Sequence, residues 1–370
     1  MIPVFRPCYD EEEAIAVQAV LKSGWAGLGP KTKEFEERFA QYIGVKYAVA
    51  VNSATAALHL ALKVIEIEGY EVITTPMTFV STNHAILYNR GIPVFADIEA
   101  DTLNISPDSI KKLITDKTKA ILLVHFGGYP CDMDEIGDIA HRYNLFVIED
   151  CAHACGAEYK GRKVGSIGDL GCFSFHAVKN LATGDGGMIT TNNERFYERL
   201  IRLRWLGITK DTWERDKYSQ YSWYYDVVEV GYKCHMNDIA AAIGIVQLSK
   251  LDRLNRKREE LTNLYNSLLD GISEVKTPIL KAGRKSAYHN YVVKAERRDE
   301  LNIYLAGKGI STSVHYFPNN HYKIYENYKG DTPVSDNIWK KILTLPLYPD
   351  LEEKDIHFIV NKIRSFYASS

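Results

Sequence analysis

The sequence predicts an α/β protein: a mainly parallel, seven-stranded sheet with helices on both faces, followed by a smaller α+β domain. Two observations predict this fold class. Short apolar and β-branched runs alternate with segments of helical periodicity over the first two thirds of the 370 residues, an order that produces parallel strands joined by crossover helices. The runs are almost continuously apolar, as expected for strands buried on both faces.

The elements of this sheet can be placed in order along the chain. Strands are expected at residues 47–51, 71–75, 93–97, 119–125, 145–149, 170–175 and 187–191. Helices are expected between most of them, for example at residues 55–65, 79–88 and 132–143.

The pattern changes after Tyr232. A long helix is expected over about residues 236–269, apolar in its N-terminal half and charged in its C-terminal half, so it should leave a buried interface and run out along the surface. Weaker strands at 273–278, 288–294 and 311–315 accompany helices at 300–307, 334–341 and 353–365. We therefore expect a large domain at residues 1–249 and a small domain at residues 250–370, joined by the long helix.

The composition excludes several classes of function. Apolar residues make up 46% and charged residues 25%, which is ordinary for a soluble globular protein. The 45 basic and 47 acidic residues give a net charge of −2, without the basic excess that nucleic-acid binding usually brings. No apolar run approaches the roughly 20 residues needed to cross a bilayer. Six cysteines, with no export signal apparent, predict free thiols in a cytoplasmic protein.

The first candidate site follows the strand at 47–51, where a short polar turn runs directly into a helix rich in Ala and Leu. Ser53 or Thr55 can cap this helix. The free N–H groups and the positive dipole end of its first turn suit an anion such as a phosphate. A simple helix cap without a ligand would give the same pattern. The chain has no Walker A motif that would suggest a nucleoside triphosphate.

The second candidate site ends the strand at 145–149, where Glu149 and Asp150 are followed by His153. A carboxylate at a strand end can hold a cationic ring nitrogen. A helix cap would equally explain Asp150, and a satisfied buried histidine would explain His153. Cysteines on both sides of His153 suggest zinc, but no second Cys/His couple is evident, so we expect no metal.

The third candidate site is Lys179, just beyond the strand at 170–175. A partly buried lysine has a lowered pKa and can attack a carbonyl group. A surface lysine in a hairpin-like loop is the alternative. The glycines at 184, 186 and 187 argue against this alternative, because they indicate a positive φ or a close approach of the backbone. An anion site, a ring-nitrogen carboxylate and a carbonyl-reactive lysine are together what pyridoxal 5′-phosphate (PLP) needs.

These residues resemble the DegT/DnrJ/EryC1/StrS sugar aminotransferases. The resemblance rests on I-E-D-x-A-H-A-x-G-A, beginning at residue 148, and on G-D-x-G-x-F-S-F-x-x-x-K-x-x-x-x-G-x-G-G, beginning at residue 168. Further collinear motifs extend from Gly29-Pro30 to Leu345-Pro346-Leu347-Tyr348-Pro349. The resemblance implies PLP-dependent transferase fold type I, which is that of aspartate aminotransferase, and a PLP-dependent homodimer.

The resemblance also implies roles for the matching positions at the cofactor. Lys179 would bind the cofactor covalently and then serve as the base that moves a proton. Asp150 would pair with the pyridine nitrogen, Phe79 would stack on the ring, and His153 would lie near the ring and its phenolic oxygen. The phosphate would be held by Ala54, Thr55 and Ser174.

Two further parts of the site follow from the resemblance. The family often has G-x-N-x-R-M before the long helix, and its Asn reaches the partner subunit's cofactor phosphate. Here Lys233 and His235 replace the Asn and the Arg. Lys233 would therefore serve the partner's phosphate as a point charge. His315 and Tyr316 would face the substrate. Residues 213–225 hold two Trp and four Tyr, which suit either a sugar nucleotide or a subunit interface.

The function implied is transfer of an amino group from an amino acid, expected to be L-glutamate, to a nucleotide-linked keto sugar, expected to be a 4-keto-6-deoxyhexose. A C3-keto sugar or a keto-cyclitol is the alternative acceptor. A non-catalytic regulator of the same fold would have lost Lys179 or Asp150, and both are present. A dehydrating branch of the family has histidine in place of the lysine. A nicotinamide-dependent dehydrogenase would need a G-x-G-x-x-G motif after the first strand, which is missing.

Overall fold

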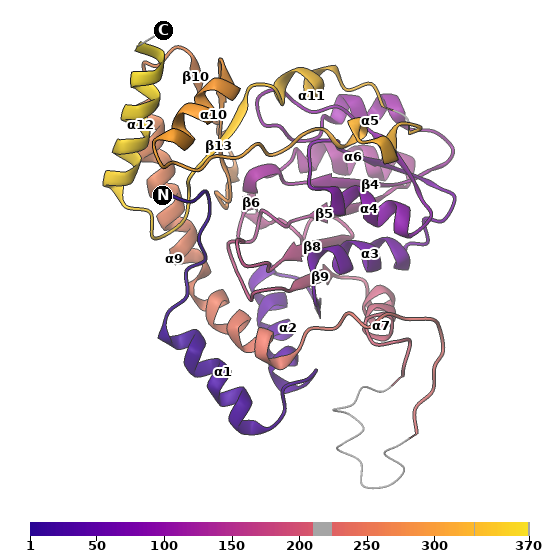
Figure 1. Cartoon of the computed structure of the whole chain (residues 1–370). Helices are drawn as coiled ribbons and strands as arrows, with labels where there is room; N and C mark the ends of the chain where they lie inside the picture. Colours follow the sequence, from indigo (N-terminus) through magenta and orange to yellow (C-terminus); the bar gives the residue numbers. More distant parts are fainter. Residues whose placement is uncertain (210–223, 329, 369–370) are drawn as a thin grey trace.

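The computed structural model describes residues 1–209, 224–328 and 330–368. A seven-stranded sheet forms its centre (Figure 1), in the order β1 (Tyr47–Val51), β9 (Gly187–Thr191), β8 (Leu170–Ser174), β5 (Phe146–Asp150), β4 (Thr118–Val124), β2 (Glu71–Thr74) and β3 (Ile92–Phe95). Strand β9 runs antiparallel to both of its neighbours, and the other neighbouring pairs are parallel. The prediction of a mainly parallel sheet of seven strands is confirmed.

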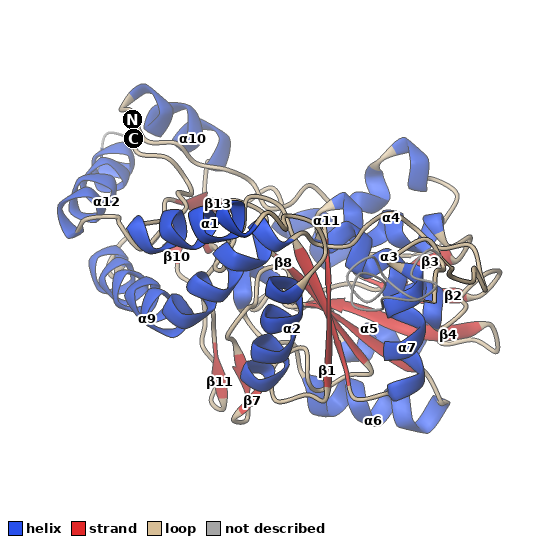
Figure 2. Cartoon of the chain, turned by 90° about the horizontal axis from the view of Figure 1, so that it is seen from below, coloured by secondary structure: helices blue, strands red, loops and turns tan. Residues whose placement is uncertain are grey.

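Helices cover both faces of this sheet, because alternate side chains of the buried strands point to opposite sides. On one face, α3 (Ala54–Val64) and α7 (Glu194–Leu203) pack on a cluster that includes Leu122 and Ile148. On the other face, α6 (Met133–Tyr143) packs on a cluster that includes Val147. Figure 2 shows α3 and α6 on opposite sides of the strands.

The remaining elements surround this core. The helices are α1 (Glu11–Ser23), α2 (Pro30–Ile43), α4 (Val80–Tyr88), α5 (Pro107–Leu113) and α11 (Pro333–Ile338), and the short strands β6 (Glu158–Tyr159), β7 (Arg162–Lys163) and β11 (Arg284–Lys285) form a small separate sheet. No described helix combines the length and the apolar character that a bilayer crossing requires. All six cysteines are free, as expected.

The C-terminal part is built around the long helix α9 (Asp238–Leu269). A second sheet of order β10 (Val275–Lys276), β12 (Tyr291–Ala295) and β13 (Ile342–Leu345) packs with α10 (Arg298–Gly307) and α12 (Glu353–Ala368). The charged half of α9 does more than cover the surface, because Leu261, Tyr265 and Leu269 are buried in this second core. The domain boundary at 249/250 falls inside α9 and stays a prediction.

One expected strand is wrong. Residues 311–315 form no continuous ladder, because their pairing is divided between two partners. Ser311 donates its backbone N–H to the carbonyl of Ile2, whereas Ser313 forms a single bridge with Thr344 of β13. The N-terminal residues therefore lie against the C-terminal part, as the labelled N-terminus in Figure 1 shows.

The glycine turn before β9 brings two of the predicted site segments together. Gly184 has a φ of +89°, and a Cβ on Gly187 would lie 2.5 Å from the carbonyl carbon of Ser53. Both reasons expected for glycine therefore occur, a positive φ and a close approach. Because Gly187 has no side chain, β9 can pass directly beneath the start of α3.

Candidate active site

A cavity of about 580 Å³ opens at the carboxyl edge of β1, β5 and β8. This edge is where ligands bind in parallel α/β sheets. Nine of the ten predicted site residues line the cavity: Ala54, Thr55, Phe79, Asp150, His153, Ser174, Lys179, His315 and Tyr316. The tenth, Lys233, lies elsewhere on the chain.

One end of the cavity is formed by the start of α3. Ser53 is the cap, because its Oγ accepts the backbone N–H of Ala56 at 3.1 Å. The first turn of a helix has no intrahelical partners for its N–H groups. The amides of Ala54 and Thr55 are therefore available at the cavity, with Ser174 also in its wall. Such a helix N-terminus favours an anion.

The carboxylate of Asp150 lies deeper in the same cavity. Its Oδ2 accepts the hydroxyl proton of Thr82 at 2.8 Å, and its Oδ1 accepts the backbone N–H of Ala152 at 3.0 Å. Burial raises the pKa of Asp150, although these two hydrogen bonds and Lys179 oppose the shift. A bound cation at this position would restore the preference for the ionised form. Thr82 was not predicted, and its only signal is its position one turn after Phe79.

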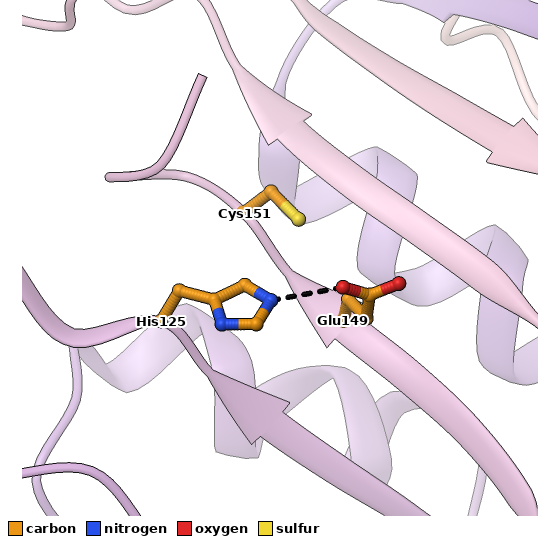
Figure 3. Close-up of side chains that lie close together, drawn as sticks. All are labelled: His125, Glu149 and Cys151. Atoms are coloured by element: carbon orange, nitrogen blue, oxygen red, sulfur yellow. Dashed lines mark hydrogen bonds and ion pairs between the residues drawn. The ribbon is translucent and has the colours of Figure 1, made fainter. Parts of the chain in front are cut away.

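Glu149, the residue before Asp150, faces the other side of the sheet and has a different role. Its carboxylate accepts N–H groups from Gly165 at 2.8 Å, Ile167 at 2.8 Å and Gly168 at 2.7 Å. It also lies 2.9 Å from Nε2 of His125, and Figure 3 draws these two side chains pointing toward each other. Burial alone would raise the pKa of Glu149, but these hydrogen bonds lower it below its ordinary value.

The cluster of His125, Glu149 and Cys151 has the residue types of a metal site, with its potential ligand atoms within 4.8 Å of one another. Its hydrogen bonds argue for a structural role. Nδ1 of His125 accepts the N–H of Cys131, so the ring proton lies on Nε2 and points to Glu149. Burial and the two neighbouring acids raise the pKa of Cys151 well above its ordinary value, which keeps the sulfur protonated. Metal binding requires deprotonated sulfur and a free nitrogen lone pair.

Lys179 follows β8 and lines the same cavity as the start of α3. Burial lowers its pKa to about 8, and Asp150 opposes this shift. About a tenth of the amine is therefore unprotonated at pH 7, far more than at the ordinary pKa of lysine, and the unprotonated form is the nucleophile. Its Nζ lies 3.4 Å from Nε2 of His289. No feature of the sequence identified His289 as a site residue, because it lies 110 residues after Lys179.

His153, Tyr316 and His315 form the wall towards the C-terminal part. The hydroxyl of Tyr316 lies 3.0 Å from Nε2 of His153, while Nδ1 of His153 is buried without a partner among the described residues. Nδ1 of His315 pairs with the hydroxyl of Thr344 at 2.8 Å, and burial lowers the pKa of His315 to about 4. Phe79 is 58% exposed at the rim, with its ring centroid 6.4 Å from that of Tyr316.

Lys233 lies outside the cavity of its own chain. Its Nζ lies 3.4 Å from the centroid of the Trp205 ring. Together with Trp25, Leu28 and His235, these two residues line a separate surface hollow of about 330 Å³. Residues 213–223 of the aromatic segment lie outside the described residues, and Tyr224 and Tyr225 are exposed.

Comparison with known proteins identifies the family. The family model of the DegT/DnrJ/EryC1/StrS aminotransferases matches residues 7–364. The chain belongs to this family. The spore coat polysaccharide biosynthesis protein SpsC of Bacillus subtilis is 42% identical to this DegT/DnrJ/EryC1/StrS member, over 98% of this chain and 96% of SpsC.

Solved structures extend the comparison. The putative sugar aminotransferase Spr1654 of Streptococcus pneumoniae, in its PMP-form, is 34% identical, with a TM-score of 0.93 over 99% of this chain and 98% of that one. PseC of Helicobacter pylori, an aminotransferase involved in the biosynthesis of pseudoaminic acid, is 29% identical, with a TM-score of 0.93 over 100% of both chains. Spr1654 has also been solved in a PLP-form. The fold is that of the type I aminotransferases.

This family member is a PLP-dependent aminotransferase, and the cavity fits that cofactor. The free amides of α3 and Ser174 suit the phosphate, and the buried carboxylate of Asp150 suits a protonated ring nitrogen. The buried Nδ1 of His153, which has no hydrogen-bond partner in the described part of the chain, offers a polar contact for a substituent of the cofactor ring. Lys179 supplies an amine of lowered pKa within the same cavity.

The two adjacent acids should respond differently to loss of charge. Glu149→Gln should lower the free energy of unfolding by about 3 kcal/mol, because an amide nitrogen would face buried N–H donors. Asp150→Asn should change it by less than about 1 kcal/mol, because burial already disfavours that charge and an amide can keep both hydrogen bonds. Urea unfolding of the two cofactor-free variants measures this difference.

The pH dependence provides a check. Because the folded-state pKa of Glu149 is lowered, its stabilisation is complete above the unfolded value of about 4.3 and is lost as the pH falls through the folded value. The gap between wild type and Glu149→Gln should therefore narrow on acidification. If Glu149→Gln and Asp150→Asn had the same free energy of unfolding at neutral pH, the structural role of Glu149 would be contradicted.

Proposed function

We propose that this aminotransferase moves an amino group from L-glutamate to a nucleotide-linked keto sugar, specifically a 4-keto-6-deoxyhexose. The observation that carries the proposal is the meeting of Lys179, Asp150 and the α3 N-terminus around one polar cavity. The named activities of Spr1654 and PseC, and the polysaccharide pathway of SpsC, support a sugar as the acceptor. A C3-keto sugar or a keto-cyclitol would need the same three groups in the cavity. The half-reactions described below distinguish these acceptors from a 4-keto-6-deoxyhexose.

The cofactor, when bound, supplies an electron sink that stabilises negative charge on the carbon carrying the amino group. Lys179 would first bind the cofactor covalently through Nζ. Once released from the cofactor, its amine would accept a proton from the substrate carbon and later donate that proton again. A pKa of about 8 suits this task, since the same group must both accept and donate near neutral pH.

Other residues of the chain would orient the cofactor. Asp150, fixed by Thr82 and Ala152, would hold a proton on the ring nitrogen. Ala54 and Thr55, through their amides, and Ser174, through its hydroxyl, would hold the phosphate. Phe79 would cover one face of the ring, and His153 would contact it beside the phenolic oxygen.

The substrate end of the cavity would be formed by His315 and Tyr316. A sugar pyrophosphate has two negative charges and several hydroxyl groups, which need hydrogen-bond donors. Among the described residues that line the cavity, Lys179 is the single lysine and there is no arginine. A partner subunit that inserts Lys233 would add a cation at the cofactor phosphate, so we infer a homodimer with composite sites. Such a dimer would close by a two-fold axis and contain two equivalent sites.

The lysine assignment has a direct test. Borohydride reduction of the holoenzyme should fix the cofactor on the peptide that contains Lys179, as mass spectrometry would show. Lys179→Ala should lose this attachment and at least about 10²-fold in transamination rate, because it removes the base. Lys163→Ala serves as the control, since Lys163 pairs with Glu158 away from the cavity. A label on another lysine would refute the assignment.

The substrate assignment is tested in separate half-reactions. Enzyme aminated by L-glutamate should be restored to the aldehyde form by a nucleotide-linked 4-keto-6-deoxyhexose, faster than by C3-keto sugars or keto-cyclitols. His315→Ala and Tyr316→Phe should slow the sugar half-reaction about tenfold, as loss of one hydrogen bond does, and leave the glutamate half nearly unchanged. Equal damage to both halves, with a lower Tm, would instead indicate a packing role.

The composite site is tested by complementation. Lys233→Ala should weaken cofactor binding in the homodimer, because a cation near the phosphate is lost. Heterodimers of Lys179→Ala and Lys233→Ala chains should regain part of the activity, since one of their two sites has both lysines intact. Full activity of Lys233→Ala alone, or a monomer in sedimentation, would overturn the trans contact.

A further inference from the structure

We propose that His289 is a positioning residue for Lys179: Asn180 fixes its ring proton on Nδ1, so the bare Nε2 accepts a hydrogen bond from the lysine amine. This inference rests on the proposed role of Lys179. It concerns a residue that the mechanism above does not use and that lies 110 positions after Lys179 in the sequence.

The orientation of the Asn180 amide decides the tautomer. Its Nδ2 lies 2.6 Å from the backbone carbonyl of Ala287 and 2.8 Å from Oδ1 of Asn255. A carbonyl oxygen only accepts, so the nitrogen of Asn180 must face Ala287. Its Oδ1 therefore faces Nδ1 of His289, at 3.0 Å. Nδ1 must carry the proton, because this oxygen can only accept it.

The next residues of the network fix Asn180 in turn. Asn255 donates its Nδ2 to the backbone carbonyl of Cys155 at 2.9 Å. Its Oδ1 accepts from Asn180 and from Nη1 of Arg258, at 3.2 Å. Arginine can only donate, so the direction of every hydrogen bond from Arg258 to His289 is determined. Reversing one amide would bury groups without partners, at a cost of about 1–3 kcal/mol each.

The ring of His289 also stacks with two other rings. The centroid of Phe5 lies 5.2 Å away with planes 3° apart, and that of His153 lies 4.6 Å away. The ring is 3% exposed. Burial and the neighbouring Lys179 hold the pKa of His289 well below its ordinary range, so the ring stays neutral. Its Nε2 lone pair remains aimed at Nζ of Lys179, 3.4 Å away.

A fixed acceptor restricts an otherwise flexible amine. When Lys179 has no covalent bond to the cofactor, one of its N–H bonds points to His289, and its lone pair can then face the substrate carbon. After Lys179 accepts a proton from that carbon, the same hydrogen bond holds the ammonium in place. No proton passes to His289. The role is therefore to orient the base, which raises the rate by limiting unproductive conformations.

The tautomer is tested without reference to activity. Enzyme labelled with 15N-histidine and loaded with pyridoxamine 5′-phosphate keeps Lys179 free, and 15N NMR distinguishes protonated from bare ring nitrogens. The signals of His289 are assigned by their absence in His289→Gln. We expect Nδ1 protonated and Nε2 bare. Asn180→Leu should lose this preference, whereas Asn361→Leu, on the exposed face of α12, should not. An Nε2-protonated or doubly protonated ring in the wild type would overturn the proposal.

The kinetic effect is tested in the glutamate half-reaction. His289→Phe keeps a stacking ring but removes Nε2, so kcat should fall about fivefold to tenfold with little change in KM. The isotope effect with α-deuterated glutamate should rise, because proton transfer becomes more limiting. Borohydride should still label Lys179. His141→Phe, an exposed change on α6, is the matched control. An unchanged kcat and isotope effect would overturn the proposal.

The two proposals fail separately. If borohydride labels another lysine in the wild type, the proposed function of Lys179 is wrong, whatever the tautomer of His289. If Lys179 is labelled and His289 is protonated on Nε2, the proposed function stands and the positioning role is lost.

Discussion

One buried charge organises the carboxyl edge of the central sheet. The carboxylate of Glu149 at the end of β5 receives a hydrogen bond from His125 at the end of β4 and three from the loop 165–168 that leads into β8. Three neighbouring strands are thereby fixed relative to one another. Because successive residues of a strand face opposite sides, the same backbone directs Asp150 into the cavity. Glu149 therefore stabilises the strands, and Asp150 faces the cavity.

Much of this arrangement could be predicted because it is encoded locally. Buried strands give apolar runs, and Asp150, Lys179 and the α3 cap each follow such a run. The strand expected at 311–315 is wrong because nothing in the local sequence shows that Ile2, about 300 residues earlier, takes part of the pairing. His289 could not be found from the sequence, since its role depends on contacts with residues over 100 positions away.

The electrostatics of the cavity depend on keeping several histidines neutral. Burial lowers the pKa of His153 and His289 well below the ordinary value and that of His315 to about 4, and Lys179 contributes to each shift. These rings therefore act as dipoles and hydrogen-bonding groups rather than as competing cations. None of these three rings therefore titrates in the range in which Lys179 gains and loses a proton. Asp150 supplies the opposing charge that keeps the shift in the pKa of Lys179 moderate.

The N-terminal segment has a consequence for how the protein is handled. Ile2 pairs with the C-terminal part, and Phe5 both lines the cavity and stacks on the ring beside Lys179. Phe5 is thus part of the wall of the active site, although it lies more than 40 residues before the first strand of the central sheet. Met1 is 96% exposed and can carry an affinity tag into solvent, whereas a deletion that removes Phe5 would open the cavity wall beside His289.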